Sequence, residues 1–420
     1  MAVVTVSGNP VVGAKYSVTT ASSADWASVS NSTYFFDLTD QLVYYKNSSG
    51  AVVNPFAGGG LTYFTEAQNT TAPNATVPVD SLTAVSSAAN ADMALLPKGT
   101  GAFIVGHIPL NTYDTGIKRG NYAVDIQPGP FSYNGGASGI GSVAIGYQNQ
   151  VTGNYGVSIG LFGVASGTAS VWLGGDSGGV GVASGDYSVA MQLQSRATNT
   201  ASFAIQNGNA TGVNAFAGNY GTASGTNSLA MAGETYARSV ASNTNSVAIG
   251  AGCVSDARSS ISFGMYSSSK GVAQRLSLGS FQDVGPYLVG NSQLSISSTV
   301  TTTTTNTAIE LLAYGGTAIN LVLQNNEAIR VKGSIIGKQS ASTNVTSYDF
   351  DCVIVRGTTA ASTVIKVSNM NLVWDDIICT VLPTLTADTT NGGLSVKSGG
   401  KLTTTIKWSC RIDSTESILA

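Results

Sequence analysis

The sequence predicts an all-β protein built around a stack of short repeated strands, and three observations indicate this fold class. A five-residue motif with apolar residues two positions apart recurs along the middle of the chain. Charged residues make up only 10% of the chain, against roughly 25% in an ordinary soluble domain. Glycine is abundant, with 50 residues, and no long helical pattern is present. The motif starts at Ser142, Gly156, Ser170, Ser188, Ser202, Asn214, Ser228, Ser246, Ser260 and Arg275, so that successive starts differ by 14, 14, 18, 14, 12, 14, 18, 14 and 15 residues.

A small β domain is predicted over residues 1–57. Thr33–Phe56 reads as strands around a turn at Asn47–Gly50, because β-branched and aromatic residues flank a run of turn formers. Its aromatic residues are expected to form the core of this domain, and the functional alternative is a surface that anchors the chain to a virion. These residues are Tyr34, Phe35, Phe36, Tyr44, Tyr45 and Phe56.

A connector is predicted over residues 58–130, beginning at the triple glycine Gly58–Gly60. The segment Thr65–Asn90 is polar and contains prolines, so we expect extended backbone there. Met93–Gly106 is predicted to form a β-hairpin with its turn at Pro97–Gly101.

The repeats are predicted to fold as a β-roll over residues 131–282. In an extended chain Val143 and Ile145 face one way, whereas Ser142, Ala144 and Gly146 face the other. A strand, a turn and a second short strand return the chain one step along an axis, so coils stack about 4.8 Å apart. We expect the stack to bury the Val/Ile pairs, and the small-residue face to allow another surface to come close. The two 18-residue intervals indicate loop insertions.

The repeats, such as SVAIG at Ser142–Gly146 and again at Ser246–Gly250, resemble the heads of trimeric autotransporter adhesins (YadA-like heads) and related segments of bacteriophage tail fibres. The resemblance implies a left-handed parallel β-roll and a homotrimer of chains packed side by side. The closing glycine of the motif is missing at Gln192, Gln206 and Ala232, and looser coils are expected there.

Two segments follow the repeats. A neck or linker is predicted over residues 283–306, because the β-branched polar run Ser295–Thr307 favours extended backbone, with a disordered linker as the alternative. Residues 307–420 are predicted to form an antiparallel β-sandwich of the jelly-roll kind. Apolar and polar residues alternate strictly in Tyr348–Ile354 and Leu402–Ile412, which is typical of a sheet with one buried face.

The net charge and the targeting signals reduce the number of protein classes to which the chain can belong. The net charge of −3 comes without a basic cluster, which excludes a nucleic-acid-binding protein. No stretch approaches 18 apolar residues, and Met1–Pro10 lacks the features of a signal peptide. An autotransporter adhesin would need a secretion signal and a membrane anchor. A phage fibre, assembled in the host cytoplasm and released by lysis, needs neither, so the phage fibre is favoured.

The resemblance therefore implies a structural virion protein and not an enzyme: a homotrimeric tail fibre without cofactor or metal. Its N-terminus would attach to tail, baseplate or adaptor proteins, and its C-terminal domain would bind a bacterial surface receptor, preferably a glycan, through residues that the sequence does not identify. Three alternatives stay open, namely a capsid-decorating head fibre, a glycan depolymerase of the tailspike type and a bacterial trimeric adhesin.

Several short motifs resemble the sequence signatures of catalytic or phosphate-binding sites. Gly175–Gly179 spells GDSGG and Gly156–Gly160 spells GxSxG, but a catalytic triad needs a base and the chain has one histidine, His107. Ser158 is expected inside a strand rather than at a strand-to-helix elbow. Gly333–Lys338 is one residue short of a phosphate-binding loop. These motifs therefore predict no active site.

Paired carboxylates are the stronger catalytic candidate. Asp349 and Asp351 are predicted to share one face of a strand, and Asp375 and Asp376 follow Trp374. Glycosidases use two carboxylates several ångströms apart, and such a pair could equally bind a cation. Hydrolysis stays a minor alternative, because no long β-helix or propeller is predicted.

The four cysteines are interpreted as buried free thiols. They lack the CxxC spacing and the neighbouring histidine that would indicate a metal site. A disulfide is the alternative. The residues are Cys253, Cys352, Cys379 and Cys410.

Overall fold

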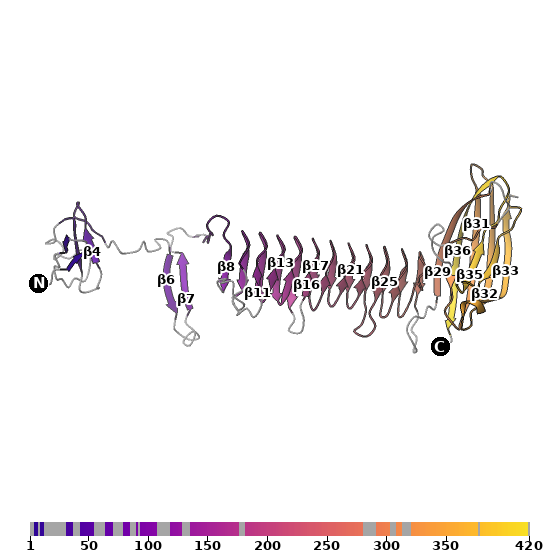
Figure 1. The fold of residues 1–420 in the computed structure, drawn as a ribbon, viewed down its shortest axis with the longest axis horizontal. Helices are drawn as coiled ribbons and strands as arrows, with labels where there is room; N and C mark the ends of the chain where they lie inside the picture. The colour runs from indigo at the N-terminus through magenta and orange to yellow at the C-terminus, as the bar shows by residue number, and fades with distance from the viewer. Residues whose placement is uncertain are drawn as a thin grey trace. The chain divides into compact units, whose positions relative to one another are not determined.

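The computed structural model divides the chain into two compact units, Met1–Leu96 and Pro97–Ala420 (Figure 1). None of the residues it describes form a helix long and apolar enough to span a membrane. The structure describes residues 4–6, 9–11, 31–36, 43–53, 64–69, 79–84, 90, 93–106, 118–127, 135–175, 181–279, 291–302, 308–312, 321–376 and 379–418.

The first unit consists of small antiparallel sheets. The predicted turn at Asn47–Gly50 is confirmed: Asn47 Oδ1 accepts hydrogen bonds from the amides of Ser49 and Ala51 at 3.1 and 2.9 Å. Phe56 and Gly58–Gly60 lie outside the described residues. The pairs are β1 (Val4–Val6) with β2 (Asn9–Val11), β3 (Thr33–Phe36) with β4 (Val43–Lys46), β4 with β5 (Val52–Val53), and β6 (Phe64–Asn69) with β7 (Val79–Ala84).

The second unit begins with the β-roll, a stack of coils (Figure 1) in which two parallel sheets face each other across one buried core. Nine coils contribute one strand to each sheet, as the repeat spacing predicts, and the last two strands of the roll belong to the first sheet alone. The first sheet contains β9 (Val124–Gln127), β11 (Val143–Tyr147), β13 (Val157–Leu161), β15 (Val171–Gly175), β17 (Val189–Met191), β19 (Phe203–Ile205), β21 (Phe216–Gly218), β23 (Leu229–Met231), β25 (Val247–Ile249), β27 (Ile261–Phe263) and β28 (Arg275–Leu278). The second contains β10 (Gly136–Ala137), β12 (Gln150–Val151), β14 (Gly163–Ala165), β16 (Gly181–Ala183), β18 (Arg196–Ala197), β20 (Asn209–Ala210), β22 (Thr222–Ala223), β24 (Val240–Ala241) and β26 (Val254–Ser255).

The roll begins earlier than predicted, at β8 (Phe103–Gly106). The hairpin predicted over Met93–Gly106 is wrong, because β8 pairs in parallel with β9. Phe103 lies beside Val124 and Val105 beside Ile126, so the apolar alternation of β8 continues that of the repeats.

One coil has a different register from the prediction. Phe216 pairs with Phe203 and with Leu229, so the coil starts at Ala215 and not at Asn214. The two neighbouring intervals are therefore 13 and 13 residues instead of 12 and 14. Asn214 is instead a turn residue with a φ of 54°.

The expected orientation of the two strand faces is inverted. Ala144 and its counterparts in the first sheet point into the roll and are completely buried, whereas Val143 and Ile145 point outward and are half-buried. The reason is the thinness of the coil: two short strands joined by tight turns leave room between the sheets only for small side chains. The interior column of the first sheet consists of Asp125, Ala144, Ser158, Trp172, Ala190, Ala204, Ala217, Ala230, Ala248, Ser262 and Ser277.

A single large residue in this column shows how tight the interior is. Trp172 occupies the position of an alanine and is 1% exposed. A Cβ atom added to Gly163 or Gly181 would lie 2.1 or 1.7 Å from its indole ring. The two glycines of the neighbouring strands therefore make the room that the ring needs.

Both loop insertions lie at the same edge of the roll. The first falls between β15 and β16, where residues 176–180 are outside the description, and the second between β23 and β24. Where the closing glycine is missing, Gln192 and Gln206 adopt a left-handed turn with φ of 64° and 46° and still donate backbone hydrogen bonds to the preceding coil.

The opposite edge has regular spacing because glycines stack there from coil to coil. A Cβ atom added to Gly153 would lie 2.0 Å from the carbonyl oxygen of Gly167. We therefore expect Gly153→Ala to destabilise the roll by about 1–3 kcal/mol or more, the usual cost of overpacking. Thermal unfolding followed by circular dichroism measures this. Ser166→Ala, at an exposed position of a neighbouring turn, is the control, and equal melting temperatures for both variants would contradict the prediction.

The predicted neck is an integral strand. Residues Asn291–Thr302 form β29, which pairs antiparallel with the last roll strand β28 on one side and with β36 (Thr404–Ile418) on the other. The extended backbone expected from the β-branched run is confirmed, but a separate neck or disordered linker at these positions is wrong. Residues 303–307 lie outside the description.

Antiparallel sheets follow the roll, as predicted for this region (Figure 1). They pack around one core that includes Ile329, Phe350, Leu394 and Trp408. The apolar faces predicted for Tyr348–Ile354 and for Ile406–Ile412 are buried, while Leu402 precedes its strand and is 47% exposed. The large sheet has the order β29, β36, β31 (Glu327–Gln339), β32 (Val345–Val355) and β33 (Val364–Asp375), and the small one β30 (Leu321–Val322), β35 (Gly393–Lys397) and β34 (Thr384–Asp388); a 3₁₀ turn spans Ala360–Ser362.

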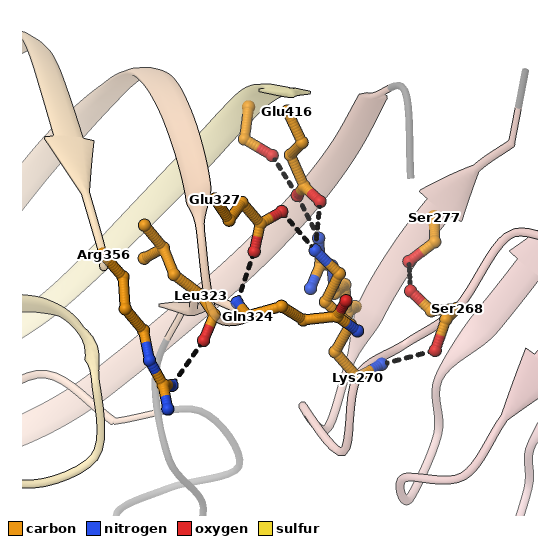
Figure 2. A network of polar contacts seen from close by, with 10 residues as sticks. Ser268, Lys270, Ser277, Leu323, Gln324, Glu327, Arg356 and Glu416 are labelled. Atoms are coloured by element: carbon orange, nitrogen blue, oxygen red, sulfur yellow. Dashed lines mark hydrogen bonds and ion pairs between the residues drawn. The ribbon is translucent and has the colours of Figure 1, made fainter. Parts of the chain in front are cut away.

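A buried network of charges joins the roll to these sheets (Figure 2). Lys270 and Arg275 come from the last coils of the roll, Glu327 begins β31 and Glu416 lies near the end of β36. Lys270 Nζ contacts Glu327 and lies 2.8 Å from Glu416 Oε2, and Arg275 pairs with Glu416. The side chains are at most 4% exposed. Two positive and two negative charges thus balance without solvent.

The two glutamates respond differently to this environment. Burial raises the pKa of Glu327, and Lys270 offsets this only in part. Burial also opposes ionisation of Glu416, but Arg275 and Lys270 together outweigh it and hold its pKa below the ordinary value. Glu416 is therefore the carboxylate whose ionised form both cations of the roll stabilise.

Candidate functional site

The outer face of the large C-terminal sheet is the candidate functional site. Alternate residues of its strands point into the core, so the remaining residues point away from it. Near the edge strand β33 most of these outward residues are polar and lie around one exposed aromatic ring, while Ile336 and Val367 are exposed apolar residues of the same face. We call this surface the Trp374 face, and it consists of Ser334, Ser347, Asp349, Asp351, Asn369, Asn371 and Trp374.

A β-bulge brings Trp374 to this face. Tyr348 pairs with Leu372 and Ser347 with Trp374, so Val373 is an extra residue in β33. Without it, Trp374 would share the strand face of Leu372 and point towards the other side of the sheet. The indole is 59% exposed. The bulge therefore presents a large aromatic ring to solvent.

Asp376 holds the indole in place. Trp374 Nε1 donates to Asp376 Oδ1 at 3.0 Å, and the amide of Val345 donates to Asp376 Oδ2 at 2.9 Å. The carboxylate thus ties the ring to the start of β32. Of the second predicted carboxylate pair, Asp376 supports the indole. Asp375 pairs with Thr346 and so lies on the other face of β33 from Trp374.

The other predicted pair does share one strand face, since Asp349 and Asp351 both point outward from β32. Asp351 is ion-paired with Arg330, with 2.7 Å between Oδ2 and Nη2. The hydrogen bond from Arg330 lowers the pKa of Asp351, although burial acts weakly against it. A general acid of a glycosidase needs a raised pKa, so Asp351 is unsuited to that role. No described residues form a group of three or more possible metal ligands.

The cysteines are free thiols, as interpreted from the sequence. Cys253, Cys352 and Cys410 are buried and Cys379 is partly buried. Burial raises the pKa of Cys352 to about 11 and that of Cys379 to about 12, so neither is a thiolate nucleophile at neutral pH.

The motifs that imitate catalytic signatures have structural roles where the structure describes them. The Ser158 hydroxyl is buried inside the roll and donates to Asn149 Oδ1 at 3.0 Å. Gly333–Lys338 lies within strand β31 and therefore forms no phosphate-binding loop. His107 and Asp176–Gly179 lie outside the described residues.

Sequence reasoning missed two features of the site. The order of residues along β33 does not reveal the bulge at Val373. The sequence of a Trp followed by two Asp residues is a local signal that could have pointed to this surface. The amides of Asn369 and Asn371 also received no role, because their neighbours Asp349 and Asp351 belong to another strand.

Comparisons with known proteins agree with the roll. Residues 137–162 and 237–253 match the YadA head domain repeat. No curated protein was found that matches the chain in sequence.

Among solved structures, the chain has a limited likeness to the tailspike protein gp49 of Acinetobacter baumannii bacteriophage Fri1, described as a capsular polysaccharide depolymerase. The identity is 10% and the TM-score 0.18, over 75% of this chain and 58% of the tailspike. The chain thus spans less than two thirds of that protein. From the repeat match and the stacked coils together, this chain carries YadA head domain repeats on a parallel β-roll.

Proposed function

We propose that the chain is a homotrimeric fibre protein of a bacteriophage tail. Its N-terminal unit attaches to the virion, its roll serves as a stiff spacer, and its Trp374 face binds a glycan on the host surface. The proposal rests on the repeat match, on the outward face of the roll and on the composition of the Trp374 face.

The observation that supports it most strongly is the apolar outer surface of the first roll sheet. Each coil places two outward residues there, for example Val157 with Ile159 and Val247 with Ile249. Ile159 is 40% and Phe263 38% exposed in the single chain. A continuous apolar surface of this length is unusual for a monomer and typical of a subunit interface. Two further copies of the same chain would cover it.

Sedimentation velocity tests this proposal. We expect a particle near three times 42.6 kDa with a high frictional ratio. A compact particle with the mass of one chain would contradict the fibre.

The Trp374 face has the chemistry for a glycan. The C–H bonds on one side of a pyranose ring pack against the electron-rich face of an indole. Asn369, Asn371 and Asp349 can exchange hydrogen bonds with its hydroxyl groups. The three chains of a trimer would present three such faces, so modest single-site affinity is amplified by effective concentration.

Trp374→Ala is expected to lower binding to the host surface at least about 30-fold, the effect of losing a hot-spot residue. Retention of labelled protein on host cells measures this loss. Ser409→Ala, an outward and exposed substitution on β36, is the control and should bind normally. Unchanged binding by the Trp374 variant would place recognition elsewhere on the chain.

Two measurements separate this proposal from its rivals. Immunogold labelling of virions distinguishes a tail fibre from a capsid fibre. Release of reducing sugar from host polysaccharide, abolished by Asp349→Asn or Asp375→Asn, would instead identify a depolymerase. We expect no release.

A further inference from the structure

A row of tyrosines along one edge of the roll is a second candidate site. At this edge the chain passes from the second sheet to the first, and the turn residue of each coil adopts a left-handed conformation. Tyr122, Tyr155 and Tyr187 occupy three of these turns, with φ of 59°, 58° and 58°. Their exposed fractions are 62%, 63% and 67%.

The tyrosines occupy alternate coils. Gly141 lies in the coil between Tyr122 and Tyr155, and Ala169 in the coil between Tyr155 and Tyr187, both in the same left-handed turn. The row is regular because each turn amide donates to the preceding coil: Tyr155 to Ile140 at 2.7 Å and Tyr187 to Thr168 at 2.8 Å. Two coil steps separate neighbouring rings, a distance of roughly 10 Å.

The small residues between the rings shape the row. A Cβ atom added to Gly141 would lie 2.9 Å from Cδ1 of Tyr155, so this ring rests on the bare backbone of the preceding coil. The backbone covers one side of the ring, and the ring still leaves most of its surface to solvent. A bulky residue at Gly141 would displace it.

A requirement of the turn does not explain the tyrosines. Left-handed turns favour Gly and Asn, and a bulky side chain there is uncommon. Further along the same edge the chain uses asparagine: Asn214, Asn227 and Asn245 form a ladder with hydrogen bonds of 3.0 and 3.2 Å. The turn thus accepts Asn, and the rings serve something other than backbone geometry.

We propose that this edge, the Tyr122–Tyr187 row, binds an extended glycan that runs along the axis of the roll. The spacing of two coils is close to the length of two pyranose rings in an extended chain, so every second sugar can stack on a tyrosine. Each turn of this edge between Asn121 and Ala201 contains a left-handed residue and the residue before it. Among these residues Asp186 is the one that carries a charge. A nearly uncharged edge favours an uncharged stretch of polymer over a polyelectrolyte. The row lies on the roll, apart from the Trp374 face, and would hold a long surface polysaccharide.

The test uses the full-length protein on an array of bacterial capsular and O-antigen polysaccharides. Oligosaccharides of two, four and eight sugars cut from a retained polysaccharide then measure length dependence by calorimetry. We expect affinity to rise steeply from two to eight sugars, since only the longer chains reach a second and a third ring. Each single Tyr→Asn substitution should lower affinity for the longest oligosaccharide about fivefold.

The variants are chosen so that folding is preserved. Asn occupies the same turn in other coils, so Tyr155→Asn should leave the melting temperature unchanged, and Tyr155→Phe should retain binding. Tyr236→Asn is the control, because Tyr236 is fully exposed on the insertion at the opposite edge. The sedimenting mass is measured for every variant.

Several results would overturn the proposal. Binding that is independent of oligosaccharide length, or unchanged by the row substitutions while Trp374→Ala abolishes it, would leave the Trp374 face as the glycan site. A changed sedimenting mass in the Tyr→Asn variants would make the rings contacts between chains. An array on which the wild-type protein retains no polysaccharide would also refute the row. Loss of the trimer or of Trp374-dependent cell binding refutes the proposed fibre function separately.

Discussion

Glu416→Gln is expected to destabilise the second unit by about 3–5 kcal/mol, the usual cost of breaking a buried ion pair by removing one partner. Glu416 is ion-paired with both Lys270 and Arg275. In this network of four buried side chains, replacing the Glu416 carboxylate with the uncharged amide of Gln leaves Glu327 as the one carboxylate for the two cations. Chemical denaturation at pH 7 measures the change. Asp413→Asn on the same strand is the control, since its ion pair with Arg411 is at the surface. Equal stability of the two variants would contradict the role assigned to the network.

The pH dependence of this effect has a definite sign. The pKa of Glu416 is lowered in the folded state, so its stabilising contribution is present above the unfolded pKa of about 4.3 and is lost as the pH falls through the lower folded value. The stability difference between wild type and Glu416→Gln should therefore shrink in acid. The raised pKa of Glu327 acts in the opposite direction, favouring the folded state at low pH. A difference that grows on acidification would contradict this assignment.

Ile159→Asp is expected to convert the proposed trimer to single chains. The substitution places a carboxylate in the middle of the outward apolar face, and closing the interface would bury it three times without a partner, at a cost of several kcal/mol per chain. The side chain is 40% exposed in the single chain, so the coil itself should stay folded. Sedimentation velocity should show the mass fall from three times 42.6 kDa to 42.6 kDa.

Two controls accompany this variant. Thr152→Asp introduces the same charge at an exposed turn of the roll and should leave the mass unchanged. Ile159→Val keeps the face apolar and should also leave it unchanged. A trimer that persists in the Ile159→Asp variant would show that the chains associate through another surface.

The sequence by itself determined the coil period, the strand alternation and the β-rich class of this protein. Local physics is enough for these features. Apolar residues two positions apart specify extended backbone, and a constant interval between turns specifies stacked coils. For the same reason the alternation from Ile406 to Ile412 correctly predicted a buried strand face.

Tertiary structure alone decided which face of each coil points inward. Alternation defines two faces but does not rank them, and the choice depends on the distance between the two sheets. Because that distance admits alanine and serine, Ala144 is buried and Val143 lies outside. The register at Asn214 was undecidable for a similar reason, since its motif fits intervals of 12 and 14 residues as readily as 13 and 13.

Long-range partners account for the remaining differences. The run Ser295–Thr307 predicted extended backbone, but its partner strand β36 lies about a hundred residues further along the chain. Lys270 meets Glu416 across 146 positions, and no local pattern links them. Trp374 reaches the outer face through one extra residue, Val373, whose effect exists only against the register of β32. A sequence records which residues are present in order, whereas pairing across a sheet depends on the whole fold.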